Sequence, residues 1–479
     1  MRQSNCLSWT PFFSGRVFNT ASALALSILM SVSLIFFLQH SKEYVVLAAA
    51  VFFFGMSIMA LAGGIVKRLI YSIFLIQIAA SYFLQFSFFV TVFCMIFAPP
   101  VILLSRNLGK IDAIPYHKPL ALMLSGWLIS LVYSVVYSYN DYGYTFVFDI
   151  YLLLGFCIAY LVYFMLKLEY LNVDRLMRYI MFSGLFFIGM VLVKYVINGY
   201  ALQILNGRFG MLVDVNSNLL SLYIGMTLPC VFFPALFEIR NTAKKKILYA
   251  ISLIYLYIMV ITGSRGGFLG IAILIAYLLW YKRSIKWVLG ALAGFVVIYF
   301  TVGLKYMTRL FAPSTTEIMS DLGRLELLKV AFKILRDNYF FFGIGMNNYS
   351  RLKMDYGFPV WFSSQSPYPV ESLSSHNIYT EMWMGWGILG LLGWLIFNGC
   401  IVYALLRNKE ERYNSTAKAI AFAMSSFLLY GLVDSNIGNF SVMFTYFSLL
   451  GTGLFIIAQT NYTSNKSTDI QTDFDQPNS

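Results

Sequence analysis

Apolar runs of about twenty residues follow one another along most of this sequence. A helix needs about 20 apolar residues to cross a ~30 Å hydrocarbon core, and only 11% of the residues are charged, less than half the share usual in soluble domains. The sequence therefore predicts an all-α polytopic membrane protein with about 14 transmembrane helices, or 12 to 14 because the division within 69–104 is ambiguous. The runs lie at 20–39, 45–66, 69–86, 88–104, 120–139, 147–166, 179–197, 217–237, 247–262, 267–281, 287–303, 377–406, 419–434 and 441–459.

The same composition excludes several other classes of protein. Hydrophobic residues make up 59% of the chain, too many for a disordered protein. The five cysteines are an odd number, and four of them fall in apolar runs, so neither a disulfide framework nor a metal cluster is expected. The net charge of +13 is explained by topogenic charge in cytoplasmic loops rather than by binding to nucleic acid.

The distribution of basic residues predicts the orientation of the chain. The segments on the side of the N-terminus hold 22 Lys and Arg residues, whereas the short loops opposite hold only Lys42, Arg208 and Arg265. The positive-inside rule then places both termini in the cytoplasm. The expected order is a cytoplasmic tail, eleven spans, a large outer loop, three spans and a disordered cytoplasmic tail, at 1–19, 20–303, 304–376, 377–461 and 462–479.

The outer loop 304–376 carries an amphipathic helix of its own, predicted at 321–336. Its apolar face is expected to contain Leu325, Leu328, Phe332 and Leu335. Such a helix commonly lies flat at the level of the lipid headgroups. Two roles remain open, an interfacial anchor for the loop and a lid over a cavity that opens outward.

Three polar groups of residues interrupt the apolar pattern, and the predicted topology places all of them on the outer side. The first is Asn206-Gly207-Arg208-Phe209-Gly210, followed by Asp214, Asn216 and Asn218. The second is Gly263-Ser264-Arg265-Gly266-Gly267, and the third is Ser374-Ser375-His376-Asn377-Ile378-Tyr379. Each alone has an ordinary explanation. A lone arginine at a helix end often reaches for lipid phosphate, a boundary histidine is often a solvated cap, and the glycines from Gly385 to Gly393 favour close helix packing.

Together the three groups supply two fixed cations and one base. The planar fork of arginine suits phosphate oxygens, and Gly266 and Gly267 would let backbone N–H groups approach an anion. Histidine is the side chain best suited to take a proton from a hydroxyl near neutral pH. Two arginines on a pyrophosphate leaving group, beside a base that activates an acceptor hydroxyl, would form a glycosyl transfer site.

The order of these segments resembles the O-antigen ligase and O-antigen polymerase superfamily of bacterial envelope proteins. The similar segments are GRFGMLVDVNSNLLSLYIG, TGSRGGFLGIAI, GRLELLKVAFKIL with FFGIGMNNY, and SSHNIYTEMWMGWGILGLLGWLIF, within about 206–400. The stretch Asp214-Val215-Asn216 lacks a proline often found there. The resemblance implies that Arg208 and Arg265 bind pyrophosphate and that His376 is the catalytic base. Arg324 also matches the pattern, and Asn216, Asn377 and Tyr379 are further candidates for substrate binding.

The resemblance also implies the substrates. The donor would be a glycan linked to undecaprenyl pyrophosphate, and the acceptor either another lipid-linked repeat unit (polymerase) or a lipid A core oligosaccharide (ligase). Other membrane proteins of polysaccharide assembly are candidate partners. No cofactor and no metal ion are expected, because the one Asp-x-Asp motif, Asp473-Phe474-Asp475, lies in the predicted cytoplasmic tail.

A transporter and an inactive scaffold are the competing classes. Ion-coupled carriers usually hold ionisable groups near the middle of the bilayer. Here Asp149, Asp214 and Asp434 lie at outer ends of predicted spans, and Glu381 is the one plausible buried carboxylate. The three polar groups argue against a scaffold. A glycosyltransferase is therefore favoured, and the fourteen spans with the long outer loop favour a polymerase.

Overall fold

The computed structural model describes part of the chain, and all of that part belongs to the second of two compact units, 1–86 and 87–479. The described residues are 115–136, 142–169, 171–200, 209–213, 215–237, 241–282, 293, 315–345, 348–359, 375–434 and 440–474. Outside them lie the first four predicted spans, nearly all of the span 287–303, and Arg208.

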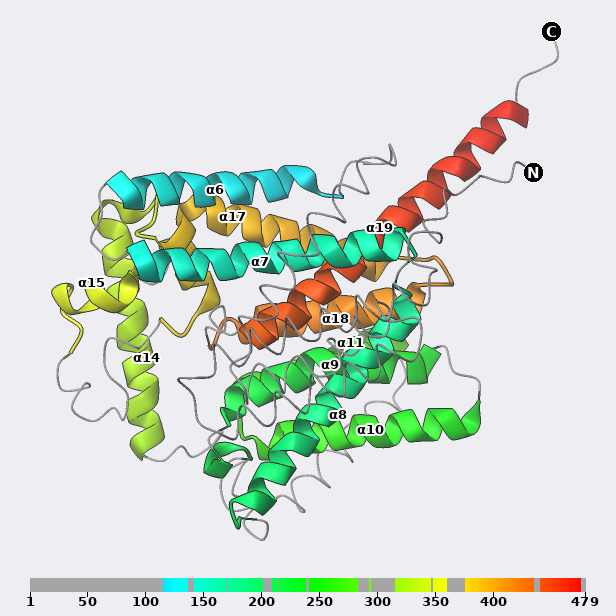
Figure 1. Ribbon diagram of the computed structural model, residues 1–479, viewed down its shortest axis with the longest axis horizontal. Helices are drawn as coiled ribbons and strands as arrows, with labels where there is room; N and C mark the ends of the chain where they lie inside the picture. Colours follow the sequence, from blue (N-terminus) through cyan, green and yellow to red (C-terminus); the bar gives the residue numbers. More distant parts are fainter. Residues whose placement is uncertain are drawn as a thin grey trace, which may run out of the picture. The chain divides into compact units, whose positions relative to one another are not determined.

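The described part of the chain is built from helices and contains no strand (Figure 1). Each of the nine predicted spans that lie mostly within it overlaps one helix, and α9 begins and ends at the predicted residues, 217 and 237. The helices of the bundle are α6 (His117–Val136), α7 (Tyr142–Lys167), α8 (Val173–Ile197), α9 (Ser217–Phe237), α10 (Thr242–Ile261), α11 (Arg265–Lys282), α17 (Ile378–Arg407), α18 (Asn414–Tyr430) and α19 (Phe440–Phe474).

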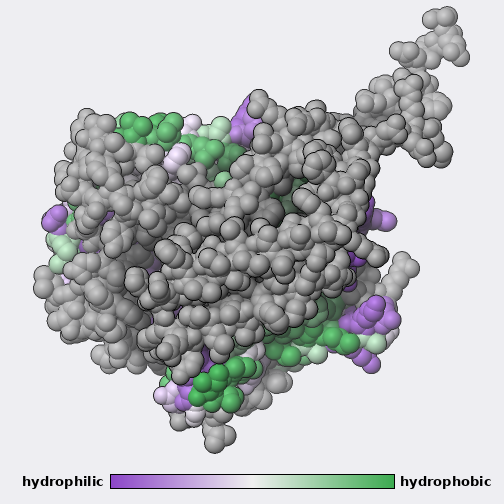
Figure 2. Space-filling model, viewed as in Figure 1, coloured by the Kyte–Doolittle hydropathy of each residue, from purple (hydrophilic) through white to green (hydrophobic). Residues whose placement is uncertain are grey.

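Four helices in this part are long and apolar enough to cross a membrane: Val173–Ile197, Ser217–Leu236, Ile378–Arg407 and Val442–Thr460. Two of the four carry large exposed apolar side chains, as at Val196 on α8 and Leu392 on α17, whereas Ser217–Leu236 and Val442–Thr460 are largely buried. Figure 2 shows hydrophobic patches over α6 and α10, with hydrophilic residues gathered at one end of α10. The prediction of a helical, multi-pass membrane protein is confirmed, whereas the total of fourteen spans and the sidedness remain predictions.

Asparagine side chains start three of these helices. Asn172 caps α8 by accepting a hydrogen bond from the N–H of Arg175, and Asn241 caps α10 by accepting from Ala243 and Lys244. Asn377 caps α17 in the same way. Asparagine is favoured at this position because its oxygen satisfies N–H groups that have no partner within the helix.

Small residues allow α17 to lie directly against α6. A Cβ atom on Gly126 would stand 2.3 Å from the backbone nitrogen of Gly390, and one on Gly393 would stand 2.4 Å from that of Met123. Such distances leave no room for a side chain, so backbone packs on backbone, as is common between membrane helices. The packing role predicted for the glycines of this span is confirmed at Gly390 and Gly393.

Helix α17 is interrupted at Gly387, where the sequence pattern predicts one continuous span. Gly387 has φ 66° and ψ −177°, a conformation that is open to glycine and disfavoured for other residues. A segment of the predicted outer loop fills the break, with the N–H of Ile344 donating to the carbonyl of Met384 over 2.6 Å. A Cβ on Gly387 would stand 2.1 Å from the carbonyl oxygen of Phe341. The segment around Phe341 and Ile344 therefore docks on the N-terminal half of α17.

The segment predicted as the outer loop contains α14 (Thr315–Ile334), a π-helical turn η3 (Leu335–Tyr339) and α15 (Tyr349–Asp355). In Figure 1, α14 lies across the direction of the bundle helices. The predicted helix is present. Of its predicted apolar face, Leu325 and Phe332 are about half exposed, whereas Leu335 is buried. The side chains that form the core with α15 come from another face of the helix: Leu327, Val330, Ala331 and Ile334, with Leu335 following in η3.

The C-terminal tail also differs from its prediction. Helix α19 continues to Phe474, through most of the segment 462–479 that the polar composition predicts to be disordered. The residues from 454 to 476 contain neither glycine nor proline, so nothing in the backbone ends the helix where the apolar run stops.

Candidate functional site

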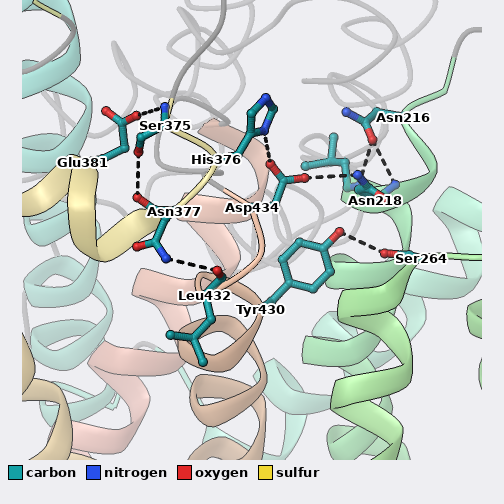
Figure 3. A network of polar contacts seen from close by, with 11 residues as sticks. Asn216, Asn218, Ser264, Ser375, His376, Asn377, Glu381, Tyr430, Leu432 and Asp434 are labelled. Carbon is teal, nitrogen blue, oxygen red and sulfur yellow. Dashed lines mark hydrogen bonds and ion pairs between the residues drawn. The ribbon is translucent and has the colours of Figure 1, made fainter. Parts of the chain in front are cut away.

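The ends of several bundle helices meet at one place in the structure (Figure 3). The N–H of Phe209 donates to the carbonyl of Ile261 at the end of α10, over 3.0 Å, and the N–H of Ile378 donates to the carbonyl of Gly431 after α18, over 2.8 Å. The hydroxyl of Ser264 lies 3.1 Å from that of Tyr430. These contacts bring together the second and third predicted polar groups, with Phe209, the residue that follows Arg208.

His376 stands at this meeting point just before α17. Its backbone φ is 52°, in the left-handed region that few residues other than glycine adopt. Backbone strain of this kind is kept only where the surrounding structure fixes it. The buried Ser375 precedes it, the cap residue Asn377 follows it, and 28% of its side chain is exposed.

Asp434 is the partner of His376. The Nδ1 atom of the imidazole lies 3.1 Å from the Oδ1 atom of Asp434, and the other oxygen of the carboxylate accepts from the side-chain amide of Asn218 over 3.2 Å. An ionised carboxylate only accepts hydrogen bonds, so the proton between them belongs to Nδ1. In the neutral form of the imidazole with its proton on Nδ1, the Nε2 atom carries the lone pair that a general base needs.

Three residues that are predicted to bind substrate make hydrogen bonds within the protein. The amide group of Asn377 donates to the carbonyl of Leu432 over 3.0 Å, and the hydroxyl of Tyr379 donates to the carbonyl of Leu428 over 2.6 Å. Asn216 accepts from the N–H of Asn218 over 2.9 Å at the start of α9. These side chains hold the helix ends around His376, and a contact of theirs with substrate remains a prediction.

Arg265 is half-buried and is the first residue of α11, directly after Ser264. The first N–H groups of a helix have no partner within it, and this end of the helix dipole favours an anion. Gly266 and Gly267 also serve the packing of α11, and the expected role of their N–H groups in anion binding stays a prediction. A Cβ on Gly266 would stand 2.2 Å from the Tyr430 ring, and one on Gly267 2.0 Å from the Ser221 hydroxyl. They let α11 pack closely on α18 and α9.

Two predicted site residues remain, Arg324 and Arg208, and Arg208 lies outside the described residues. Arg324 lies within α14, half-buried, and no contact in the described part of the chain joins it to His376. Asp434 is the residue that the sequence reasoning missed as part of the site, although a lone carboxylate at the outer end of a predicted span was a usable signal. Among the described residues, no three His, Cys, Asp or Glu side chains come together as a metal ion would require.

Comparison with known proteins supports the resemblance seen in the sequence. A family described as O-antigen ligase matches residues 250–395, the stretch that holds Arg265, Arg324 and His376. The teichuronic acid biosynthesis protein TuaE of Bacillus subtilis (strain 168) is 26% identical over 231 residues, which are 44% of this chain and 45% of that protein. The chain thus matches less than half the length of this curated relative. The resemblance to the O-antigen ligase and polymerase superfamily is confirmed.

Proposed function

We propose that this chain is an integral-membrane glycosyltransferase of the O-antigen polymerase or ligase type. It moves a glycan from undecaprenyl pyrophosphate to an acceptor sugar at the outer face of the cytoplasmic membrane, for the synthesis of O-antigen or another surface polysaccharide. The observation that carries the proposal is the His376–Asp434 pair, at the meeting point of helix ends where Arg265 begins α11. The family match over 250–395 supports the class of reaction.

In the proposed reaction, the oxygen of an acceptor hydroxyl attacks the anomeric carbon of the donor glycan. The hydroxyl proton passes to Nε2 of His376, and Asp434 stabilises the imidazolium that forms. The bond between the anomeric carbon and the pyrophosphate oxygen breaks, and the electron pair leaves with undecaprenyl pyrophosphate. Arg265, together with Arg208, neutralises that leaving group. The reaction is proposed to need neither a metal ion nor a cofactor.

Analysis of surface polysaccharide by gel, in cells that lack the gene, tests the proposal. A polymerase is favoured, and its loss should leave single repeat units attached to lipid A core without longer chains. Loss of every core-attached form would instead mean that the chain is a ligase. An unchanged polysaccharide would contradict both forms of the proposal.

The proposed sidedness predicts the result of cysteine labelling in intact cells. A cysteine at Ser320 in the outer loop should react with a membrane-impermeant reagent, whereas one at Thr242, at the start of α10, should react only after the cells are opened. Labelling of Thr242→Cys in intact cells, or failure to label Ser320→Cys, would contradict a site on the outer face.

The proposed role of Arg265 predicts that lysine cannot replace it. A guanidinium grips pyrophosphate through two parallel hydrogen bonds, whereas an ammonium is a point charge. Arg265→Lys should therefore insert normally in the membrane yet lose most of its activity, measured as polymer per unit of inserted protein. Polymer at the normal level would show that only the charge at this position matters.

A further inference from the structure

One side of α17 carries a row of exposed apolar side chains that ends at the break in the helix. Leu389, Leu392 and Ile396 are all exposed, and because they are three and four positions apart they share one side of the helix. Helix α17 is long and apolar enough to cross a membrane. Since apolar surface is excluded from water, this row is the side of α17 that faces lipid.

The two ends of the row agree with the thickness of a membrane. At one end, the guanidinium of Arg407 lies over the exposed ring of Tyr403, 4.8 Å from its centre. Tyrosine and arginine are common where a span leaves the hydrocarbon core. From Arg407 back to Gly387 the helix is about 30 Å long at ~1.5 Å per residue, which matches a hydrocarbon core of ~30 Å. Gly387 therefore lies where α17 leaves the hydrocarbon on the other side.

The segment that docks at Gly387 brings three consecutive exposed phenylalanines to this level: Phe340, Phe341 and Phe342. The backbone of Phe341 lies directly against Gly387, while Phe341 as a whole is 64% exposed. Trp383 of α17 joins the group. Its indole N–H donates to the carbonyl of Phe340 over 2.9 Å, and the two rings meet edge-on with 4.9 Å between their centres. An exposed aromatic group of this kind marks a place where another apolar surface is bound.

Helix α14 extends the aromatic group. The ring of Phe332 meets that of Trp383 edge-on, with 6.1 Å between their centres. Leu325, Phe332 and Arg336 are exposed, and their spacing of seven and four positions places them on one side of the helix. Because α14 lies across the direction of the bundle helices (Figure 1), it runs along the membrane surface rather than through it. A cation beside apolar side chains suits such a helix, since it reaches lipid phosphate while they enter the bilayer.

We propose that Leu325, Phe332, Phe340, Phe341 and Phe342, here called the aromatic anchor, insert in the lipid bilayer at the boundary between hydrocarbon and headgroups. The occupant is phospholipid, because the anchor continues the lipid-facing side of α17 at the level where that helix leaves the hydrocarbon. Aromatic side chains are enriched at this level in membrane proteins. Of the two roles that the sequence leaves open for this helix, membrane anchor and lid, the anchor is thus the one proposed.

Photocrosslinking tests the anchor in the full chain, purified and placed in nanodiscs of palmitoyl-oleoyl phosphatidylglycerol without donor lipid. The photoreactive analogue p-benzoyl-phenylalanine replaces Phe341 or Phe332 in separate variants. After irradiation, mass spectrometry should find adducts with phospholipid acyl chains. Their yield should be within about threefold of that for the same analogue at Leu392, because side chains at the hydrocarbon boundary meet acyl chains.

Asp355 provides the matched control. It is an exposed carboxylate at the end of α15, so it is expected in water, and the analogue at this position should give at least about tenfold less lipid adduct than at Phe341. Leu392, in the lipid-facing row of α17, is the positive control. The assay reads lipid contact and not activity, so its result is independent of the transferase reaction proposed above.

Four results would overturn the inference. The first is no lipid adduct at Phe341 and Phe332 while Leu392 gives one, and the second is a yield at Asp355 equal to that at Phe341. The third is crosslinking of Phe341 to a second copy of the chain in place of lipid. The fourth is replacement of the phospholipid adduct by a polyprenyl adduct once donor lipid is added, which would make the surface a donor site. If the Phe341 variant fails to insert in the membrane, the Phe332 variant decides by the same criteria.

Discussion

Replacing His376 by alanine is expected to abolish polymer formation while the protein is still expressed and inserted in the membrane. Its Nδ1 atom is committed to Asp434 at 3.1 Å, which leaves Nε2 to take the proton of the acceptor hydroxyl. General-base catalysis contributes roughly 10²–10⁴-fold to a rate, and a loss of that size would leave no long chains on a gel. Polymer per unit of inserted protein is the measurement.

Glutamine at the same position distinguishes a catalytic role of His376 as base from a structural role as a contact of Asp434. His376→Gln keeps a side chain of similar reach that is able to donate a hydrogen bond to Asp434, but it has no basic nitrogen. If His376 is the base, the glutamine variant should be as inactive as the alanine variant. If the imidazole serves only to hold the start of α17 against Asp434, glutamine should restore polymer. Normal polymer from the glutamine variant would therefore refute the role of His376 as base.

Within the described residues, the sequence predicts the helices of the bundle well because burial in lipid imposes a simple pattern. A run of about twenty apolar residues has few alternatives to a helix, and α9 accordingly has its predicted bounds. Structural features that depend on contacts with another segment cannot be predicted from such a run. The break at Gly387 exists because the loop segment around Ile344 pairs with Met384, and the buried face of α14 is set by α15.

In the candidate site too, some features are predicted from the local sequence, whereas others depend on contacts between distant segments. Arg265 and His376 are recognisable because a cation or an imidazole is unusual beside a membrane span, and contacts between helix ends bring their segments together. The hydrogen bonds that orient the side chains of the candidate site join residues far apart in sequence, such as His376 and Asp434. No local sequence pattern predicts these contacts. The role of Arg208, which lies outside the described residues, remains a prediction.

Asp434→Asn is expected to inactivate the protein nearly as fully as the loss of His376. Asparagine has the shape of aspartate, but its amide group is able to donate a hydrogen bond to Nδ1. The imidazole would then carry its proton on Nε2, so it could no longer accept one from the acceptor hydroxyl. In serine proteases the corresponding exchange lowers kcat by about 10⁴-fold, and we expect a loss of roughly 10²–10⁴-fold here.

Asn218→Ala provides the matched control for Asp434→Asn. It removes the other hydrogen bond of the carboxylate, 3.2 Å long, and leaves the bond to Nδ1 and the tautomer of His376 in place. A hydrogen bond to a charged group contributes about 1.5–3 kcal/mol, and part of it is replaced by water at this partly exposed site, so the alanine variant should keep measurable activity. Equal activity of the Asp434→Asn and wild-type proteins would show that the carboxylate does not set the tautomer, and the His376–Asp434 pair would then be a structural contact between α17 and α18.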